Sequence, residues 1–188
     1  YYALLMITLY EVNADKKALE KSIKIMNDTW ELFFNKETQL FQKNIIKDND
    51  LFASPLDLND SNIPNGNSVY LLISNKLYSI TNDKIWSERN EVLKKSFHQV
   101  LNSYYSQMFS FIKTLDICDN SLSFTFSGTS QSIKEIQLYL QKEYLGVATF
   151  VYQLNNDTKP SVIVCKNQTC SNKLTNINEA VEYLSKSD

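Results

Sequence analysis

The chain has 188 residues, of which 43% are hydrophobic and 21% are charged, a composition typical of a globular protein with a buried core. Its 19 basic and 21 acidic residues give a net charge of −2, so no basic excess indicates a nucleic-acid partner and no basic run indicates a membrane surface. Only 3 glycines and 3 prolines occur, where average usage would give roughly 13 and 9, which disfavours a turn-rich all-β fold and favours helices.

The first twelve residues, YYALLMITLYEV, form an apolar stretch that begins without methionine. Helical spacing relates several of its apolar side chains, which predicts the end of a buried amphipathic helix with Leu5, Thr8, Leu9 and Val12 on the buried face. The stretch lacks the basic region and cleavage site of a signal peptide and is too short to span a bilayer. A helix that opens without a cap leads us to expect a fragment of a longer protein.

A second helix should begin after Asp15, a good N-cap residue, and continue to Phe34 along one apolar stripe. Together with the first segment it predicts an antiparallel αα-hairpin with a very short connection. Residues 36–63 read as a long loop that holds a short strand near Leu40–Ile46. Loops of this length are uncommon and are often functional.

A second αα-hairpin is predicted from a third helix that starts near Asn67 and a fourth that follows the turn at residues 81–83. The apolar stripe of the third helix includes a lysine, Lys76, beside Leu77. The stripe of the fourth contains Arg89, the single arginine of a chain that has 18 lysines. A short apolar helix over residues 106–115 is expected to follow.

The pattern changes at about Asp119, where SLSFTFSG alternates polar and apolar residues as a half-buried strand does. A helix over 130–144, two further strands in VATFVYQL and SVIVC, and a last helix over 177–184 complete a β-α-β-β-α order. We therefore predict an α+β, mainly helical fold. Residues 1–118 form helical hairpins and residues 119–188 form a small β-α-β-β-α unit packed on them, because no Pro-, Gly- or Ser-rich linker separates the two parts.

The segment from Asp60 to Ser68, DSNIPNGNS, is the most informative stretch for function. Its proline and glycine predict a tight turn, and Asn67 or Ser68 can cap the third helix. A helix N-terminus presents free N–H groups and a partial positive charge, which suits an anion or a sugar hydroxyl. Asp60, Gly66, Asn67 and Ser68 are therefore candidate ligand-binding residues, with a well-capped helix as the structural alternative.

This segment resembles the D-x-A-x-P-S-G-N-S motif of the thioredoxin-domain-containing proteins of the spermatogenesis-associated type. The tail VIVCKNQTCSNKLTNINEAVEYL is similar to the C-x-N-x-x-C segment and final helix that close the same family. The resemblance covers essentially the whole chain but only the C-terminal portion of the family's length. Asn65 stands where relatives usually have serine, and the basic residues that precede the aspartate in relatives are absent.

The resemblance implies that residues 1–118 belong to the C-terminal part of a six-hairpin (α/α)₆ toroid. Its implied partners are an upstream thioredoxin-like domain and the remaining hairpins of the same protein, together with a possible small polar, carbohydrate-like ligand. The redox chemistry of the family would lie in the thioredoxin-like domain, which this chain does not contain.

Cys165 and Cys170 are spaced C-x₄-C, whereas the usual redox motif is C-x-x-C and a zinc site needs four ligands, so that Cys118 and His98 would have to join them. Cys118 and His98 lack ligand-like spacing, so we predict no metal and no cofactor. Free thiols are the expected state of the cysteines, and a disulfide between Cys165 and Cys170 is the sterically possible alternative. A lone histidine is more often structural, so His98 is not assigned to catalysis.

These observations leave two main functions. The favoured one is a scaffold or binding region of a thioredoxin-domain-containing protein without catalysis of its own, placed in the cytoplasm. The alternative is part of a sugar-binding, epimerase-like or glycosidase-like toroid with a polar site at the third helix entrance. In that alternative Asp60 would act as a general base or accept a hydrogen bond from a hydroxyl.

Overall fold

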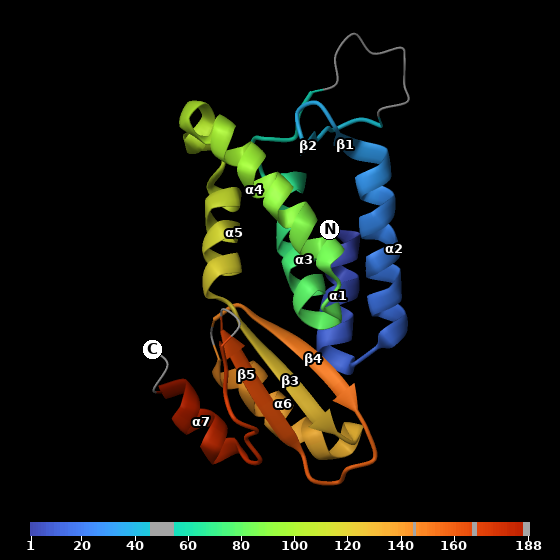
Figure 1. Ribbon diagram of the computed structural model, residues 1–188, viewed down its shortest axis with the longest axis vertical. Helices are drawn as coiled ribbons and strands as arrows, with labels where there is room; N and C mark the ends of the chain where they lie inside the picture. The colour runs from blue at the N-terminus through green and yellow to red at the C-terminus, as the bar shows by residue number, and fades with distance from the viewer. Residues whose placement is uncertain (46–54, 145, 167–168, 186–188) are drawn as a thin grey trace. The chain divides into compact units, whose positions relative to one another are not determined.

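The computed structural model describes residues 1–45, 55–144, 146–166 and 169–185, so part of the expected long loop, residues 46–54, lies outside the described residues. The chain divides into two compact units, Tyr1–Cys118 and Asp119–Asp188, which are considered separately below. Helices dominate the first unit and a small mixed sheet lies in the second (Figure 1). The prediction of an α+β, mainly helical fold is confirmed.

The first unit consists of two helical hairpins, a short two-stranded ribbon and a further helix. Its elements are α1 (Tyr2–Asn13), α2 (Lys16–Phe33), β1 (Phe34–Asn35), β2 (Leu40–Phe41), α3 (Gly66–Thr81), α4 (Lys84–Tyr104), the 3₁₀ turn η1 (Tyr105–Gln107) and α5 (Phe109–Asn120). The helices pack around one apolar core, whose largest fully buried side chains include Trp86, Phe97 and Phe111.

Both hairpin links are short, because each is built in the same way from two residues. Ala14 and Asn82 each adopt a left-handed conformation, with φ of 55°, that ends the preceding helix. The aspartate that follows then caps the next helix: Asp15 accepts hydrogen bonds from the first turn of α2, and Asp83 accepts one from the first turn of α4. The predicted cap at Asp15 is confirmed.

The face of α1 that packs inside the unit is not the predicted one. The buried side chains are Ala3, Met6, Ile7 and Tyr10, whereas Leu5 and Val12 are 52% and 51% exposed. This helix is apolar on nearly every side, so periodicity predicts that it is buried but does not select which face enters the core.

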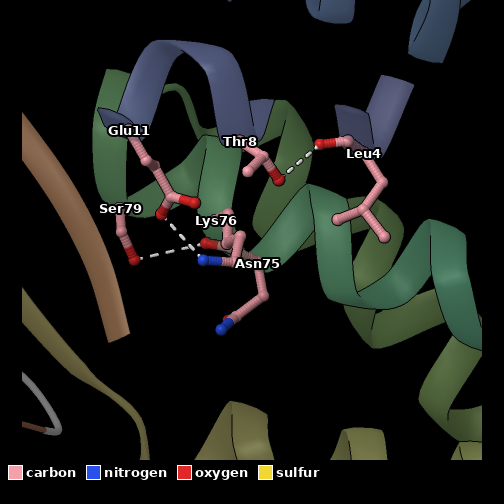
Figure 2. Close-up of polar contacts among 6 residues, drawn as sticks. All are labelled: Leu4, Thr8, Glu11, Asn75, Lys76 and Ser79. Carbon is pink, nitrogen blue, oxygen red and sulfur yellow. Dashed lines mark hydrogen bonds and ion pairs between the residues drawn. The ribbon is translucent and has the colours of Figure 1, made fainter. Parts of the chain in front are cut away.

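A buried ion pair connects α1 to α3. Lys76 Nζ lies 2.7 Å from Glu11 Oε1, and both side chains are only 10% exposed. Figure 2 shows the glutamate reaching from α1 toward the lysine of α3, one turn before Ser79. The lysine on the predicted apolar stripe therefore enters the interior with an acidic partner, as buried charges require.

The described part of the second unit consists of a four-stranded mixed sheet and two helices. Its elements are β3 (Leu122–Gly128), α6 (Ser130–Glu143), β4 (Ala148–Leu154), β5 (Ser161–Lys166), β6 (Thr169–Cys170) and α7 (Ile177–Ser185). The strand order is β4-β3-β5-β6, with β3 parallel to β4 and antiparallel to β5. Phe124 and Phe126 of β3 are fully buried in a core that also contains Ile133, Ile136 and Leu140 of α6.

The edge strand β6 is an addition to the predicted elements. It is only two residues long, which is below what alternation in a sequence can reveal. None of the described helices combines the length and apolar character that crossing a membrane requires.

Candidate functional site

The entrance to α3 is capped by Asn65. The Asn65 backbone is extended, and its Oδ1 accepts hydrogen bonds from Ser68 N and Ser68 Oγ, both at 2.9 Å. The prediction that Asn67 or Ser68 caps this helix is therefore wrong, because the helix begins at Gly66 and both residues lie within its first turn.

The Asp60 carboxylate lies beside this cap and accepts four hydrogen bonds from the described residues. Its Oδ1 accepts from Asn65 N and Asn65 Nδ2, both at 2.9 Å, and from Ser110 Oγ, while its Oδ2 accepts from Ser110 N at 2.7 Å. Burial acts to raise the pKa of the Asp60 carboxyl, but the bonds from Ser110 and Asn65 prevail and hold the pKa below its ordinary value. The carboxylate therefore ties the loop before α3 to the start of α5.

A second carboxylate occupies the first turn of α3. Gly66 N donates to Asp57 Oδ2, and a Cβ built on Gly66 would lie 2.5 Å from that oxygen. A side chain at Gly66 would displace this carboxylate, whereas the backbone conformation of Gly66 is not one that favours glycine. The positive end of the helix thus already holds an anion that belongs to the chain itself.

Asn67 and Ser68 point into the interior of the unit, with exposed fractions of 0% and 1%. The Asn67 side chain joins three segments. Its Oδ1 accepts from Phe41 N at 2.9 Å, and its Nδ2 donates to Phe41 O at 3.3 Å and to Asp57 O at 2.7 Å. The Asn67 side chain therefore pairs with the backbone N–H and C=O of Phe41 in β2, as the backbone of a neighbouring strand would.

The structure brings all four predicted residues to one helix entrance and adds several that the sequence did not reveal. Ser110 comes from a helix 50 residues away, and no local signal pairs it with Asp60. Tyr1 OH donates to Pro64 O at 2.7 Å, and burial, together with the nearby charges of Asp57 and Asp60, raises the pKa of the Tyr1 phenol. Among these added residues, only Asn65 could have been predicted from the sequence, because asparagine is a preferred N-cap residue.

This geometry limits what the entrance can do chemically. A carboxylate whose pKa is lowered is a weak base. A substrate hydroxyl would also have to donate to oxygen lone pairs that already accept hydrogen bonds from Ser110 and Asn65. Throughout the described part of the chain, every buried side-chain nitrogen or oxygen has a hydrogen-bond partner. The entrance is built as an anchor between segments.

The cysteines of the closing segment are joined. A disulfide connects Cys165 and Cys170, which oppose each other in the β5–β6 hairpin with Cα atoms 4.0 Å apart. The expectation of free thiols is wrong for this pair and holds only for Cys118. Next to this pair, Ser171 N donates to Val164 O, and Val164 N donates to the side-chain Oγ of Ser171. The short Cα separation of the cysteines is that of a close, non-hydrogen-bonded pair, which brings their side chains together.

His98 lies on the exposed side of α4, away from the helix entrance in sequence. Across the described ranges, no group of three or more His, Cys, Asp or Glu side chains is arranged to hold a metal ion.

No protein-family model matches the chain, and no curated protein matches it.

Proposed function

We propose that this chain is a scaffold and binding region from the C-terminal part of a thioredoxin-domain-containing protein, without catalysis of its own. The resemblance of the Asp60–Ser68 segment and of the closing cysteine segment, in the same order along the chain, supports this assignment. The proposed partners are the thioredoxin-like domain and the other helical hairpins of the same protein.

The second face of α1 is the observation that carries the proposal. Leu5, Leu9 and Val12 follow one another at helical spacing on the side that the unit leaves exposed, while the opposite side is buried. A helix that is apolar on both sides is typical of a position between two layers of helices. The proposed occupant of the exposed side is a further αα-hairpin of the same protein, which a toroid of hairpins would supply.

The helix entrance favours the scaffold over a sugar-binding or epimerase-like toroid. Asp57 and Asp60 use their oxygens to hold Gly66, Asn65 and Ser110. A ligand would have to displace these internal bonds before it could reach either carboxylate. The alternative function would therefore require a different arrangement of the entrance when a ligand binds.

The cytoplasm is the proposed compartment. In a reducing cytoplasm, a disulfide such as Cys165–Cys170 is usually transient or redox-sensing, whereas in an oxidising compartment it would persist. Alkylation of the protein at the moment of cell lysis measures which state is present: a reduced pair supports the cytoplasm, and a fully oxidised pair contradicts it.

Asp60→Asn tests the proposal that the entrance to α3 is a structural anchor between segments. The variant keeps the shape of the side chain but replaces the carboxylate, which accepts hydrogen bonds from Ser110 and Asn65, with a neutral amide. We therefore expect a loss of stability similar to that of Ser110→Ala. The pKa of Asp60 is lower in the folded state than in the unfolded state, so its carboxylate stabilises the fold at pH values above the unfolded pKa, near 3.9. This stabilisation disappears as the pH falls through the folded-state pKa. Wild type should therefore have a higher free energy of unfolding than the variant at neutral pH, and this difference should disappear in acid.

Glu88→Gln, which neutralises an exposed carboxylate on α4, is the matched control and should leave the stability nearly unchanged. Denaturant unfolding at several pH values measures both variants. A sugar that binds wild type but not Asp60→Asn, with the melting temperature unaltered, would instead establish the ligand-binding alternative.

A further inference from the structure

Arg89 lies in the first unit at a point where α2, α3 and α4 meet. Its guanidinium carbon is 4.8 Å from the ring centroid of Trp30 and 5.0 Å from that of Trp86. Both distances are within the range of a cation–π contact, and Trp86 is almost completely buried. Two indole rings therefore fix the guanidinium and shield part of it from water.

One end of the guanidinium is held by neutral groups. Arg89 Nη1 donates to Asn27 Oδ1 at 2.8 Å and to Tyr70 OH at 3.1 Å, which uses both of its hydrogens. Burial raises the pKa of the Tyr70 phenol, although the Arg89 charge acts in the opposite direction. Tyr70 is therefore neutral at physiological pH, and neither partner compensates the positive charge.

The other edge of the guanidinium, formed by Nε and Nη2, is open. In the part of the chain that the structure describes, Arg89 forms no ion pair, and its side-chain hydrogen bonds all come from Nη1. Because no buried side-chain nitrogen of the described residues lacks a partner, Nε and Nη2 must reach solvent. This edge carries the two parallel N–H groups that pair with two oxygens of a carboxylate or phosphate.

We propose that the open edge of Arg89, held between Trp30 and Trp86, is a binding site for a small oxyanion that bears a carboxylate or phosphate group. The site is preorganised, because the indole rings and Nη1 bonds already fix the side chain, so a ligand pays little ordering entropy. Lysine, which outnumbers arginine 18 to 1 in this chain, offers a point charge without the planar fork. The proposal does not depend on the proposed scaffold function.

The chain itself supplies two specific reporters for this site. Trp30 and Trp86 are its only tryptophans, and Arg89 is its only arginine. Tryptophan emission therefore reports on the two rings that flank the guanidinium, and the arginine Nε–H gives a single resonance in a ¹⁵N-correlated NMR spectrum.

The experiment titrates the full chain with inorganic phosphate and, separately, with acetate at constant ionic strength, using chloride as the reference salt. We expect a saturable shift of the Arg89 Nε–H resonance and a parallel change in tryptophan emission. The more effective anion identifies the ligand class. Shifts that rise linearly, or that chloride reproduces, would overturn the proposal without the need for any variant.

Arg89→Lys keeps the charge and loses the fork, so we expect the dissociation constant to rise about tenfold or more, as the loss of one charge-assisted hydrogen bond implies. Lys84→Gln removes an exposed cation from the same helix and should leave binding unchanged. Circular dichroism checks that both variants fold. Equal weakening in the two variants would show a general salt effect and no site.

Discussion

At Gly66, a single hydrogen atom in place of a side chain lets a carboxylate reach the first turn of α3. A Cβ there would lie 2.5 Å from Asp57 Oδ2, so Gly66→Ala must displace the carboxylate and weaken its bond from the backbone N–H. Alanine normally stabilises a helix relative to glycine by up to about 1 kcal/mol, whereas a hydrogen bond to a charged group contributes about 1.5–3 kcal/mol. We expect Gly66→Ala to lower the free energy of unfolding by about 1 kcal/mol.

Asp57→Ala provides the control for this prediction. Without the carboxylate there is nothing for the new methyl group to displace, so Gly66→Ala in that background should be neutral or stabilising. Urea unfolding of the two single variants and the double variant measures this reversal of sign. The same destabilisation in both backgrounds would show that glycine is needed for another reason.

Most of the helix entrance could be predicted from the sequence, since its turn formers and capping residues are neighbours in the chain. Asp60, Gly66, Asn67 and Ser68 do come together, but the cap was assigned to the wrong residue because several consecutive side chains can perform that role. Ser110 could not be predicted, because tertiary packing alone brings it to Asp60.

Between elements, a buried ion pair joins α1 and α3. Removing one partner takes the nearby opposite charge away from the other buried side chain, and breaking a buried pair in this way costs about 3–5 kcal/mol, whereas replacing both with apolar residues of similar size is often neutral or better. We therefore expect Lys76→Met to destabilise strongly and Glu11→Leu combined with Lys76→Met to restore most of the loss.

Chemical denaturation of the four members of this double-mutant cycle measures the coupling. Lys24 and Asp28 form an exposed pair on α2 and serve as the matched comparison, with an expected coupling below about 1 kcal/mol. A Lys76–Glu11 coupling as small as that of the exposed pair would contradict the prediction.

The hairpin links were predictable because their signals are local, as at Asp15, where the cap and the turn are adjacent. The packing face of α1 was not predictable, since Leu5 and Ile7 are equally suited to a core. The same reasoning explains why the sequence offers the disulfide only as the alternative to free thiols: the spacing of Cys165 and Cys170 allows both states, and only the strand register places them opposite each other.

Reduction of this disulfide tests its role in the second unit. The bond closes a loop of sequence separation 5, for which the chain-entropy relation gives roughly 2 kcal/mol. We expect a thiol-free phosphine reductant to lower the melting temperature of wild type and of Cys118→Ser alike, and to have no effect on the Cys165→Ser, Cys170→Ser double variant. Identical melting of wild type with and without reductant would contradict this contribution.

For the whole molecule, the exposed side of α1 leads us to expect a particular solution behaviour. Tyr2, Leu5, Leu9 and Val12 recur at helical spacing as a partly exposed stripe, and exposed apolar surface drives association when nothing covers it. Without its proposed hairpin partner, the isolated chain should therefore self-associate as its concentration rises. Sedimentation velocity across a wide concentration range measures the effect.

Leu5→Gln combined with Leu9→Gln should return the chain to a monomer, because both side chains lie on the exposed stripe and contribute little to the core. Leu5→Met with Leu9→Met keeps the stripe apolar and should leave self-association unchanged, which separates the loss of apolar surface from any general effect of mutating α1. Far-ultraviolet circular dichroism should be the same for all three proteins. A wild-type chain that remains monomeric at every concentration would remove the main support for a hairpin that packs on α1.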